Sequence, residues 1–529
     1  MAICRLRRFC LLTLVIAFGA TAGLAQSFQI QCPVKTITHP TAANNNAEPV
    51  YNGPTALSMG TNGYLVPSAN VNGAIKCQQI SGGDGFATMG DGSQTYLFAF
   101  GPLSGLADIA KGLPGTQFPN VFNTVYPGTL LPGDPATTVG TGGLFSYNGA
   151  VGLAPDLDAI AKGSCTAPCL TGHVDPRPIM DVGVLNGNMP APLMALDEDD
   201  EFFLTLTNVG QVMRPDLFEQ HTVHFHGYPN ASAFYDGVPD ASVAINIGGS
   251  FTYYYLSPDA GTYFWHCHIT PPEHLQMGMV GQIYVRPRQN RVPVGGSLYA
   301  ALQQQQGDPR TACNSLADIL CSNPLPATAN AATRAVTGKY AYNDGDGSTY
   351  YDVEYPLQIH GFDPNFHFVG MTFNPEGFAD MKDKYFLLNG RSYPDTVTPG
   401  PLQTQTTDGA YHFSQPLTSI VNIPAGGRAL LRIADLDVTE YQTLASLGIP
   451  MQVIGINAKL LRDQAGNNLY YATNSITLAG GESIDVILDA SDTTKYPPGS
   501  VFFLYTPNLD HLSNDAENFG GLMTEVRIN

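Results

Sequence analysis

Short hydrophobic runs separated by glycine and proline turns dominate this chain. Runs rich in aromatic and branched residues, such as 202–207 and 483–488, are preceded or followed by turns such as Gly248-Gly249 and Gly480-Gly481. Runs of this length and composition favour β-strands over helices, and patterns with a helical period are scarce. The alternation of short strands and turns is typical of antiparallel β-sandwiches.

The same order of elements occurs twice along the chain. Each copy has an asparagine-glycine turn, a strand, a double-glycine turn, a second strand and a glycine that opens a third. The first copy uses 186–190, 202–207, Gly248-Gly249, 251–255 and Gly261, and the second uses 388–391, 429–433, Gly480-Gly481, 483–488 and Gly499. An internal repeat of this kind predicts two domains of similar construction.

We therefore expect an all-β chain of two Greek-key β-sandwich domains with a long N-terminal extension and an insertion. The expected parts are a signal peptide at 1–25, the extension at 26–83, domain 1 at 84–290 with an insertion at about 104–178, a linker at 291–350 and domain 2 at 351–529. The insertion is long enough to be functional rather than a plain connection.

The N-terminus and the cysteines point to export. Arginines 5, 7 and 8 precede an apolar stretch and small residues that end at Ala25, which is the pattern of a signal peptide. No later run is long and apolar enough to span a membrane. Besides Cys267, the remaining chain has an even number of cysteines, which predicts disulfides outside the cytoplasm: Cys32, Cys77, Cys165, Cys169, Cys313 and Cys321.

The cysteine connectivity stays open at this point. Local pairing would join 165 with 169, 313 with 321 and 32 with 77, whereas a metal site at 165–169 is the alternative. The formal net charge of −20, with only 13% charged residues, suits neither nucleic acid nor an anionic membrane surface. We expect a periplasmic or extracellular protein that binds no nucleic acid.

Two histidine-rich segments carry the candidate chemistry. Residues 221–227 read His-Thr-Val-His-Phe-His-Gly, and residues 266–279 begin His-Cys-His and end Gly-Met. Together they hold six of the 12 histidines in the chain, with one cysteine and two methionines. Imidazole, a thiolate and a weak thioether form the ligand set of a blue-copper site.

Side-chain alternation along a strand sorts these ligands into two groups. Successive side chains point to opposite faces, so His266 and His268 share one face and Cys267 takes the other. In the same way His224 and His226 share a face, and His221 lies on the opposite one. We predict a type 1 copper site and a second copper site: His221, Cys267, His274 and Met279 for the first, and His224, His226, His266 and His268 for the second.

These motifs resemble those of multicopper oxidases and copper nitrite reductases, which are built from cupredoxin domains. The segment 224–227 is similar to the His-Trp-His-Gly motif of the oxidases, and 266–279 to their last copper motif. The loop between His268 and His274 is two residues longer than is usual in the family. The spacing from His274 to Met279 matches the family, which favours Met279 over Met277 as the axial ligand. The resemblance implies cupredoxin-like domains that bind copper.

The second repeat departs from the family. Thr506-Pro507-Asn508 aligns with His266-Cys267-His268, and Leu522 with Met279, so domain 2 is predicted to have lost its copper. A trinuclear cluster of the family takes four His-x-His pairs, and this chain has two. A site like that of nitrite reductases needs three histidines, one from a neighbouring subunit, yet residues 450–454 lack one. His360 and His367 are the spare candidates, although ordinary buried or loop histidines are the simpler interpretation.

The resemblance implies a copper-dependent oxidoreductase. A small-molecule or protein donor would reduce type 1 copper through His274, which we expect on an exposed loop beside Pro271 and Pro272. The strand 266–268 would carry electrons to a second site, of type 2 or type 3 copper, that reduces O2 or an oxyanion such as nitrite. Asp236 and Asp240 are candidate proton relays. The alternatives are an electron carrier, a nitrite-reductase-like enzyme and a copper-handling protein, and a homo-oligomer is possible in each case.

Overall fold

The computed structural model describes residues 36–41, 49–61, 63–103, 183–227, 233–257, 259–308, 323–370, 377–405, 409 and 411–529. The predicted signal peptide at 1–25, the insertion at 104–178 and five of the six cysteines expected in disulfides lie outside these residues. Within them Cys77 is disulfide-bonded and Cys267 is free and buried. The partner of Cys77 lies outside the described residues, so its pairing with Cys32 stays a prediction.

Domain 1 consists of two facing sheets. The first has the strand order β4 (Gln94–Pro102), β3 (Ile75–Thr88), β6 (Glu201–Gly210) and β8 (Ser250–Leu256). The second has the order β5 (Met194–Asp197), β10 (Val280–Arg286), β9 (Gly261–His266) and β7 (His224–Phe225). Leu204 of the first sheet and Trp265 of the second are both fully buried in one apolar core, as the alternation of side chains requires.

Domain 2 repeats this construction with additional strands. Its first sheet has the order β14 (Tyr385–Leu388), β13 (Val353–Phe362), β18 (Arg428–Asp435), β24 (Ser483–Asp489), β20 (Met451–Ile456) and β21 (Lys459–Leu460), and β22 (Tyr471–Thr473) pairs with β20. Its second sheet has the order β17 (Val421–Ile423), β26 (Met523–Ile528), β25 (Val501–Tyr505), β19 (Gln442–Leu447) and β23 (Ser475–Leu478). A separate core lies between these sheets.

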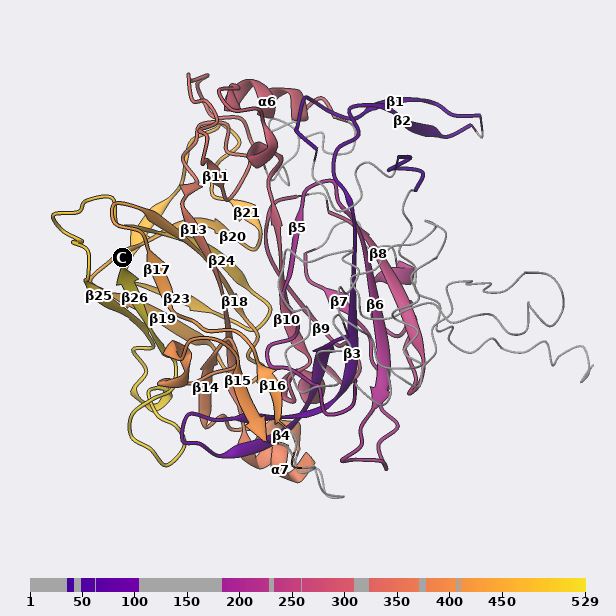
Figure 1. The fold of residues 1–529 in the computed structure, drawn as a ribbon, viewed down its shortest axis with the longest axis vertical. Coiled ribbons are helices and arrows are strands. Elements are labelled where there is room, and N and C mark those ends of the chain that lie inside the picture. Colours follow the sequence, from indigo (N-terminus) through magenta and orange to yellow (C-terminus); the bar gives the residue numbers. More distant parts are fainter. Residues whose placement is uncertain are drawn as a thin grey trace, which may run out of the picture.

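Strand direction repeats along with strand order. In the first sheets, β3 runs parallel to β6 as β13 does to β18, and in the second sheets β5 runs parallel to β10 as β17 does to β26. The predicted all-β fold of two cupredoxin-like Greek-key sandwiches is confirmed. The two sandwiches lie side by side, with the pink and magenta strands of domain 1 beside the orange and yellow strands of domain 2 (Figure 1).

Short elements connect and cover the sandwiches. The strands among them are β1 (Ala56–Met59), β2 (Leu65–Ala69), β11 (Lys339–Tyr340), β12 (Tyr350–Tyr351), β15 (Leu402–Gln405) and β16 (Tyr411–Gln415). The helices are α5 (Pro271–Gln276), α6 (Leu298–Gln305), α7 (Pro364–Gly370), η3 (Ala233–Tyr235), η4 (Arg288–Arg291), η5 (Phe378–Asp380), η6 (Asp395–Val397) and η7 (Leu509–His511). Throughout the described ranges, every helix is too short or too polar to cross a bilayer.

A buried ion-pair network joins the two domains. Glu354 of β13 accepts hydrogen bonds from Arg286 of β10 at 2.6 Å and from Arg432 of β18 at 3.1 Å. Burial disfavours the Glu354 carboxylate, but the two guanidinium groups outweigh it and lower its pKa to about 2. Because the Glu354 carboxylate pairs with one arginine from each domain, the network fixes β10 against β13 and β18.

Replacing Glu354 with glutamine should therefore destabilise the protein in a pH-dependent way. The folded-state pKa lies below the usual value of 4.5, so the contribution is complete above pH 4.5 and is lost as the pH falls towards 2. We expect Glu354→Gln to lower the free energy of unfolding at pH 7 by about 2–3 kcal/mol in urea titrations, with the difference shrinking towards pH 3.

The matched control for this measurement is Glu525→Gln. Glu525 pairs with Arg527 at 2.7 Å, but the arginine side chain is 39% exposed. A solvated pair of this kind should contribute less than about 1 kcal/mol. Equal losses in the two variants, or a loss at Glu354 that does not change with pH, would contradict the assignment.

Candidate metal centres

The pairing of β7 with β9 brings the two histidine-rich segments together. His224 lies opposite His266 in the antiparallel register, and Phe225 lies opposite Trp265. Neighbouring side chains point to opposite faces, so the histidines gather on one face and Trp265 points into the core of domain 1. Cys267 follows β9 and also lies in that core. The sorting predicted from alternation is therefore the arrangement that the strands adopt.

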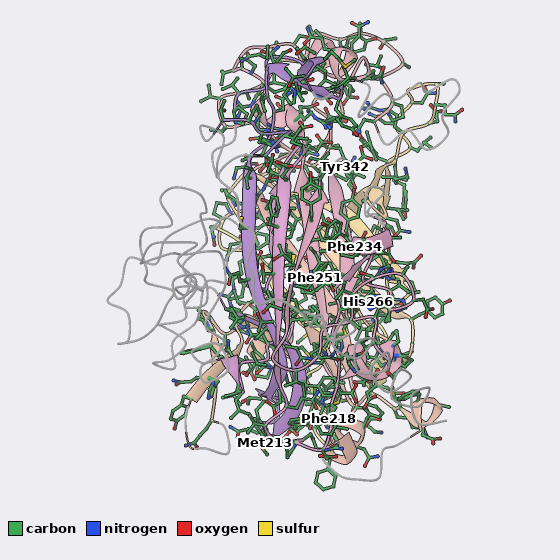
Figure 2. All side chains as sticks on the ribbon, turned by 90° about the vertical axis from the view of Figure 1, so that its right-hand side faces the viewer. Met213, Phe218, Phe234, Phe251, His266 and Tyr342 are labelled. Carbon is green, nitrogen blue, oxygen red and sulfur yellow. The ribbon has the colours of Figure 1, made fainter. Side chains whose placement is uncertain are left out.

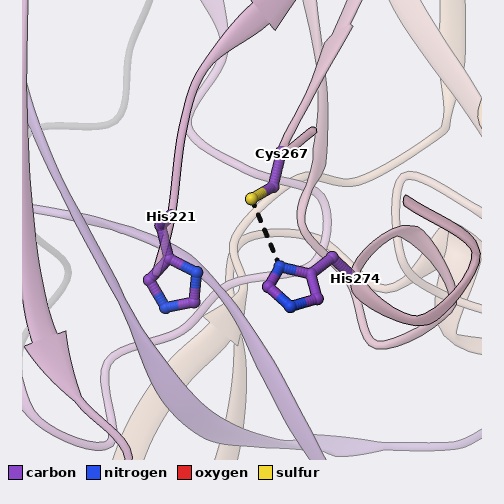
Figure 3. A group of neighbouring side chains, drawn as sticks. All are labelled: His221, Cys267 and His274. Atoms are coloured by element: carbon purple, nitrogen blue, oxygen red, sulfur yellow. Dashed lines mark hydrogen bonds between the residues drawn. The ribbon is translucent and has the colours of Figure 1, made fainter. Parts of the chain in front are cut away.

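His221, Cys267 and His274 form the first cluster (Figure 3). Their ligand atoms lie within 4.8 Å of one another, and all three side chains are fully buried. The Nδ1 atom of His274 lies 3.2 Å from the Cys267 sulfur, and the backbone N–H of Thr222 donates to the same sulfur at 3.4 Å. The cluster offers two imidazoles and one thiolate from the two histidine-rich segments.

Met279 lies beside this cluster. Its backbone N–H donates to the His274 carbonyl at 2.8 Å, and its own carbonyl accepts from the Cys267 N–H at 3.1 Å. A Cβ atom added to Gly82 of β3 would lie 2.6 Å from Cδ2 of His221 and 3.3 Å from the terminal methyl of Met279. His221 and Met279 therefore pack together over a backbone position that only glycine leaves open.

The first cluster is electrostatically prepared for a cation. Burial opposes ionisation of the Cys267 thiol, but His274 and His221 outweigh it and hold the pKa well below its usual range. Burial also opposes protonation of His274, but the thiolate raises the pKa of His274 to about 9. Within the described residues neither ring nitrogen of His221 has a hydrogen-bond partner of good geometry, and the Cys267 sulfur is the group that acts on its ring. A buried imidazole without such partners is costly, and a metal ion would satisfy it.

His224, His226 and His266 form the second cluster, with their ligand atoms also within 4.8 Å of one another. The Nε2 atoms of His226 and His266 are 2.9 Å apart. His268 lies at the edge of the group, with its ring centre 5.0 Å from that of His224 and 5.4 Å from that of His266. The structure thus brings all four histidines predicted for the second site onto one surface.

Two of these imidazoles are oriented by backbone carbonyls. Nδ1 of His224 lies 2.6 Å from the Asp236 carbonyl, and Nδ1 of His266 lies 2.7 Å from the Cys267 carbonyl. A nitrogen that donates to a carbonyl leaves the lone pair on Nε2, which is how proteins orient histidine ligands. Burial and then the nearby His224 lower the pKa of His226 to about 4, and burial lowers that of His266 to about 3. These two rings are neutral at pH 7 and can bind a metal.

The second cluster opens into a cleft between the domains, which we call the histidine cleft. It has a volume of about 570 Å³ and is lined on one side by His226, His266 and His268. Domain 2 supplies the facing wall, which includes Asp437, Thr439, Glu440 and Tyr441. In Figure 2 His266 lies between Tyr342, towards one end of the molecule, and Phe218 and Met213, towards the other. Side-chain oxygen atoms of domain 2 thus line the wall opposite the imidazoles.

His274, His360 and His367 are all buried. His274 was expected on an exposed loop, and this is wrong: it lies in α5 and is fully buried, with Phe98 against its ring and Glu219 at 3.5 Å from Nε2. His360 and His367 are buried outside both clusters. Their Nε2 atoms lie 2.9 Å from the carbonyls of Leu275 and Gln276, so they hold the segment after His274 in place and belong to neither cluster.

The candidate relays Asp236 and Asp240 lie at the opening turn that follows the first motif. Oδ2 of Asp236 lies 3.5 Å from Nδ1 of His224, and its side chain is 34% exposed. Asp240 is exposed and has no described contact with the cluster. By its position, therefore, only Asp236 stays a candidate proton relay.

Domain 2 retains the framework of the first cluster without its ligands. Tyr505 lies opposite Met523 as His266 lies opposite Val280, and Thr506 donates to Leu522 as Cys267 does to Met279. The ladder shifts the predicted alignment by one residue, because Thr506 takes the place of Cys267 and not of His266. The same register places Gln442, Thr506, His511 and Leu522 where domain 1 has His221, Cys267, His274 and Met279.

The acidic wall of the histidine cleft was not predicted from the sequence. Glu440 precedes Gln442 by two residues, as Glu219 precedes His221, and it approaches His511 at 3.3 Å as Glu219 approaches His274 at 3.5 Å. The repeat, once aligned in the correct register, contains this signal. The placement of Asp437 and Tyr441 on the wall of the same cleft as the histidines depends on how the domains meet, which no local pattern encodes.

Comparison with known proteins agrees with the motifs. Residues 171–290 match the model of the family described as multicopper oxidase. A laccase, abr2, of Aspergillus fumigatus is 34% identical over 109 residues, which cover 20% of this chain and 17% of the laccase. The multicopper oxidase MmcO of Mycobacterium tuberculosis is 31% identical over 131 residues, covering 23% and 24% of the two chains. A copper-containing nitrite reductase of Rhizobium meliloti is 34% identical over 109 residues, covering 20% and 26%.

Some solved structures are also similar to this chain. The blue copper oxidase from Nitrosomonas europaea is 17% identical with a TM-score of 0.47, and each chain is covered to 86%. The sequence matches span only about a sixth to a quarter of the relatives' length. The resemblance of this region to multicopper oxidases and copper nitrite reductases is confirmed.

The contact at Gly82 gives a direct test of the first cluster. In Gly82→Ala the new methyl group would collide with the His221 ring, so the affinity of this cluster for copper should fall at least about tenfold. Isothermal titration of the metal-free protein with Cu(II) measures the change. Gly307→Ala is the control, because a methyl group there would approach only the Gln304 carbonyl, at 3.3 Å. Unchanged affinity in Gly82→Ala would refute the arrangement of His221 and Met279.

Proposed function

We propose that this protein is a copper oxidoreductase with two metal sites in domain 1. His221, Cys267 and His274, with Met279 as the axial ligand, would hold a type 1 copper. His224, His226, His266 and His268 would hold further copper of type 2 or type 3. The observation that carries the proposal is the presence of two ligand clusters, one that contains Cys267 and one on the opposite face of the strand. In each cluster the ligand atoms of three residues lie within 4.8 Å of one another.

Copper bound at these sites would supply one-electron chemistry, received from a donor and passed to an acceptor in the histidine cleft. The chain supports this with a short covalent route. Cys267 of the first cluster is bonded through the backbone to His266 and His268 of the second. The His266 ring also receives a fixed orientation from the Cys267 carbonyl at 2.7 Å. One three-residue segment thus connects both sites.

The entrance for electrons is proposed at Glu219. Since His274 is fully buried, a donor cannot touch its ring. The Glu219 side chain, 26% exposed, lies between His274 and the surface and could accept a hydrogen bond from a donor molecule or bind a cation. Burial opposes ionisation of Glu219 less than the His274 hydrogen bond favours it, so its pKa is lowered and the carboxylate is charged at neutral pH.

The acceptor is proposed to be O2 or an oxyanion such as nitrite. Within the described residues three imidazoles line the histidine cleft, all from domain 1, His224 adjoins them, and carboxylates lie on the opposite wall. A complete trinuclear cluster with eight imidazoles does not fit this wall. A smaller copper site does, and the similarity to nitrite reductases keeps nitrite as the second candidate. An electron carrier is the remaining alternative, and a neighbouring subunit could contribute ligands in a homo-oligomer.

Export to the periplasm or the extracellular space is part of the proposal. It rests on the signal-like residues 1–25 and on the disulfide of Cys77, because disulfides persist in oxidising compartments. Metal loading there would also match the buried, reactive Cys267, which has no disulfide partner.

Separate loss of the second site tests the enzyme against the carrier. The variant carrying both His224→Ala and His268→Ala should keep the visible thiolate–copper absorption, since these rings lie on the face away from Cys267. Its turnover with O2 or nitrite should fall by at least about a hundredfold, because the acceptor's metal is removed. Absorption spectra and steady-state rates measure the two effects.

Two further variants complete this comparison. Cys267→Ser should lose the visible absorption, which assigns the colour to the first cluster. His412→Asn, on β16 away from both clusters, should leave colour and turnover unchanged. If the double variant loses colour together with turnover, the four histidines only support the first site. Wild-type protein that exchanges electrons but reduces neither acceptor would make it a carrier.

A further inference from the structure

A second pocket lies in domain 2 at the place where domain 1 holds its first metal cluster. It has a volume of about 380 Å³, and we call it the domain 2 pocket. Asp383, Glu440 and His511 are among its lining residues. His511 takes the place of His274 and is 4% exposed, with its Nδ1 atom 3.0 Å from the Gln442 side-chain oxygen. Polar groups have thus replaced the metal ligands here.

Two buried carboxyl groups stand between this pocket and the histidine cleft. Asp383 lines the domain 2 pocket and Asp437 lines the histidine cleft. A Cβ atom added to Gly361 would collide with Oδ2 of Asp383 and lie 2.6 Å from Oδ2 of Asp437, so both oxygens lie over the same backbone carbon. The wall between the two cavities is therefore bridged by one pair of carboxyl groups.

Hydrogen bonding around this pair requires a proton. The Thr439 hydroxyl contacts both Oδ2 of Asp383 and Oδ1 of Asp437, the latter at 2.9 Å. A hydroxyl carries a single hydrogen, so it cannot donate to two ionised carboxylates at once. A proton on one of the two carboxyl groups, donated to the hydroxyl oxygen, completes both contacts. Gln276 donates to Oδ1 of Asp383 at 2.9 Å and Gln442 donates to Oδ2 of Asp437 at 2.6 Å, and these bonds hold the pair in place.

The charges around the pair also favour a bound proton. Within the described chain, neither Asp383 nor Asp437 forms an ion pair with a lysine or arginine. Burial, and then the charge of Asp437, raise the pKa of Asp383 well above its usual range. The other titratable groups that face or adjoin the pair are His360 of β13, Lys384, Asp435 of β18, Glu440, Glu482 and His511 of η7. Three of these six groups are acids, which disfavour a second negative charge, and the three bases form no ion pair with either carboxyl group within the described residues.

We propose that Asp383 and Asp437 share one proton and relay protons from the domain 2 pocket to the histidine cleft. The proposal rests on the proposed function, since reduction of O2 or nitrite in the cleft would consume protons. Asp437 gives the shared proton to the reduced acceptor, Asp383 then takes a proton from water in the domain 2 pocket, leaving hydroxide that exchanges with the solvent, and this proton becomes the one shared with Asp437. Only O–H bonds break and form, and no electrons move through the pair. Domain 2 would then supply protons where domain 1 supplies electrons.

Infrared spectroscopy of the metal-free protein tests the shared proton without any turnover. At pH 7 the wild type should show the carbonyl stretching band of a protonated carboxyl group, shifted in D2O. The band should disappear in Asp383→Asn and in Asp437→Asn. It should persist in Asp492→Asn, the control, whose exposed carboxylate only accepts backbone hydrogen bonds after β24. A wild-type spectrum without the band overturns the proposal, whatever the copper chemistry is.

Kinetics of the copper-loaded protein tests the relay. In Asp437→Asn, turnover with O2 or nitrite should fall about tenfold or more, with an increased solvent isotope effect. The reduction of the first site by a donor and its visible absorption should be unchanged, which also reports that the variant is folded. Turnover in both asparagine variants equal to that of Asp492→Asn overturns the relay. Wild-type protein without turnover instead refutes the proposed function, while the infrared band still decides the shared proton.

Discussion

The alternation of side chains around Cys267 is the constraint on which the arrangement depends. Because β9 is extended where it leaves the sheet, its thiolate lies in the core of domain 1 while the neighbouring imidazoles lie on the surface that faces domain 2. A displacement of one residue would exchange these environments and place imidazoles in the apolar core. The β7–β9 and β9–β10 ladders prevent that displacement, and the hydrogen bonds between residue 267 and Met279 continue the second ladder to the axial ligand.

The same framework explains why the two domains differ in chemistry but not in fold. Replacing His221, Cys267, His274 and Met279 by Gln442, Thr506, His511 and Leu522 preserves the backbone hydrogen bonds of the loop. It removes the soft thiolate, without which a type 1 site cannot form. At the domain boundary the side chains of Gln442 and Thr439 instead form hydrogen bonds that hold Asp437 against Asp383. Domain 2 has kept the scaffold and changed what the scaffold positions.

Much of this was accessible from the sequence because the informative signals are local. The separation of His221 and Cys267 from the two His-x-His pairs follows from alternation within two short segments, His274 and Met279 were added from their place on the loop after Cys267, and the β-sandwich fold follows from the repeated strands and turns. Features that depend on distant segments were not accessible. His274 is buried because Phe98 of β4 and Glu219 cover it, although the prolines beside it suggested an exposed loop. The alignment of Thr506 needed the β25–β26 register, and the Asp383–Asp437 pair needed the packing of two separate loops over Gly361 of β13.

The central claim is that two metal sites of different kinds flank Cys267, and metal analysis with electron paramagnetic resonance tests it most directly. The account predicts at least two coppers per chain in the fully loaded wild type. One should show the narrow copper hyperfine splitting of a thiolate-bound type 1 centre, and the rest should be type 2 or a coupled, silent pair. A single copper per chain, or copper without a type 1 signal, would contradict the account.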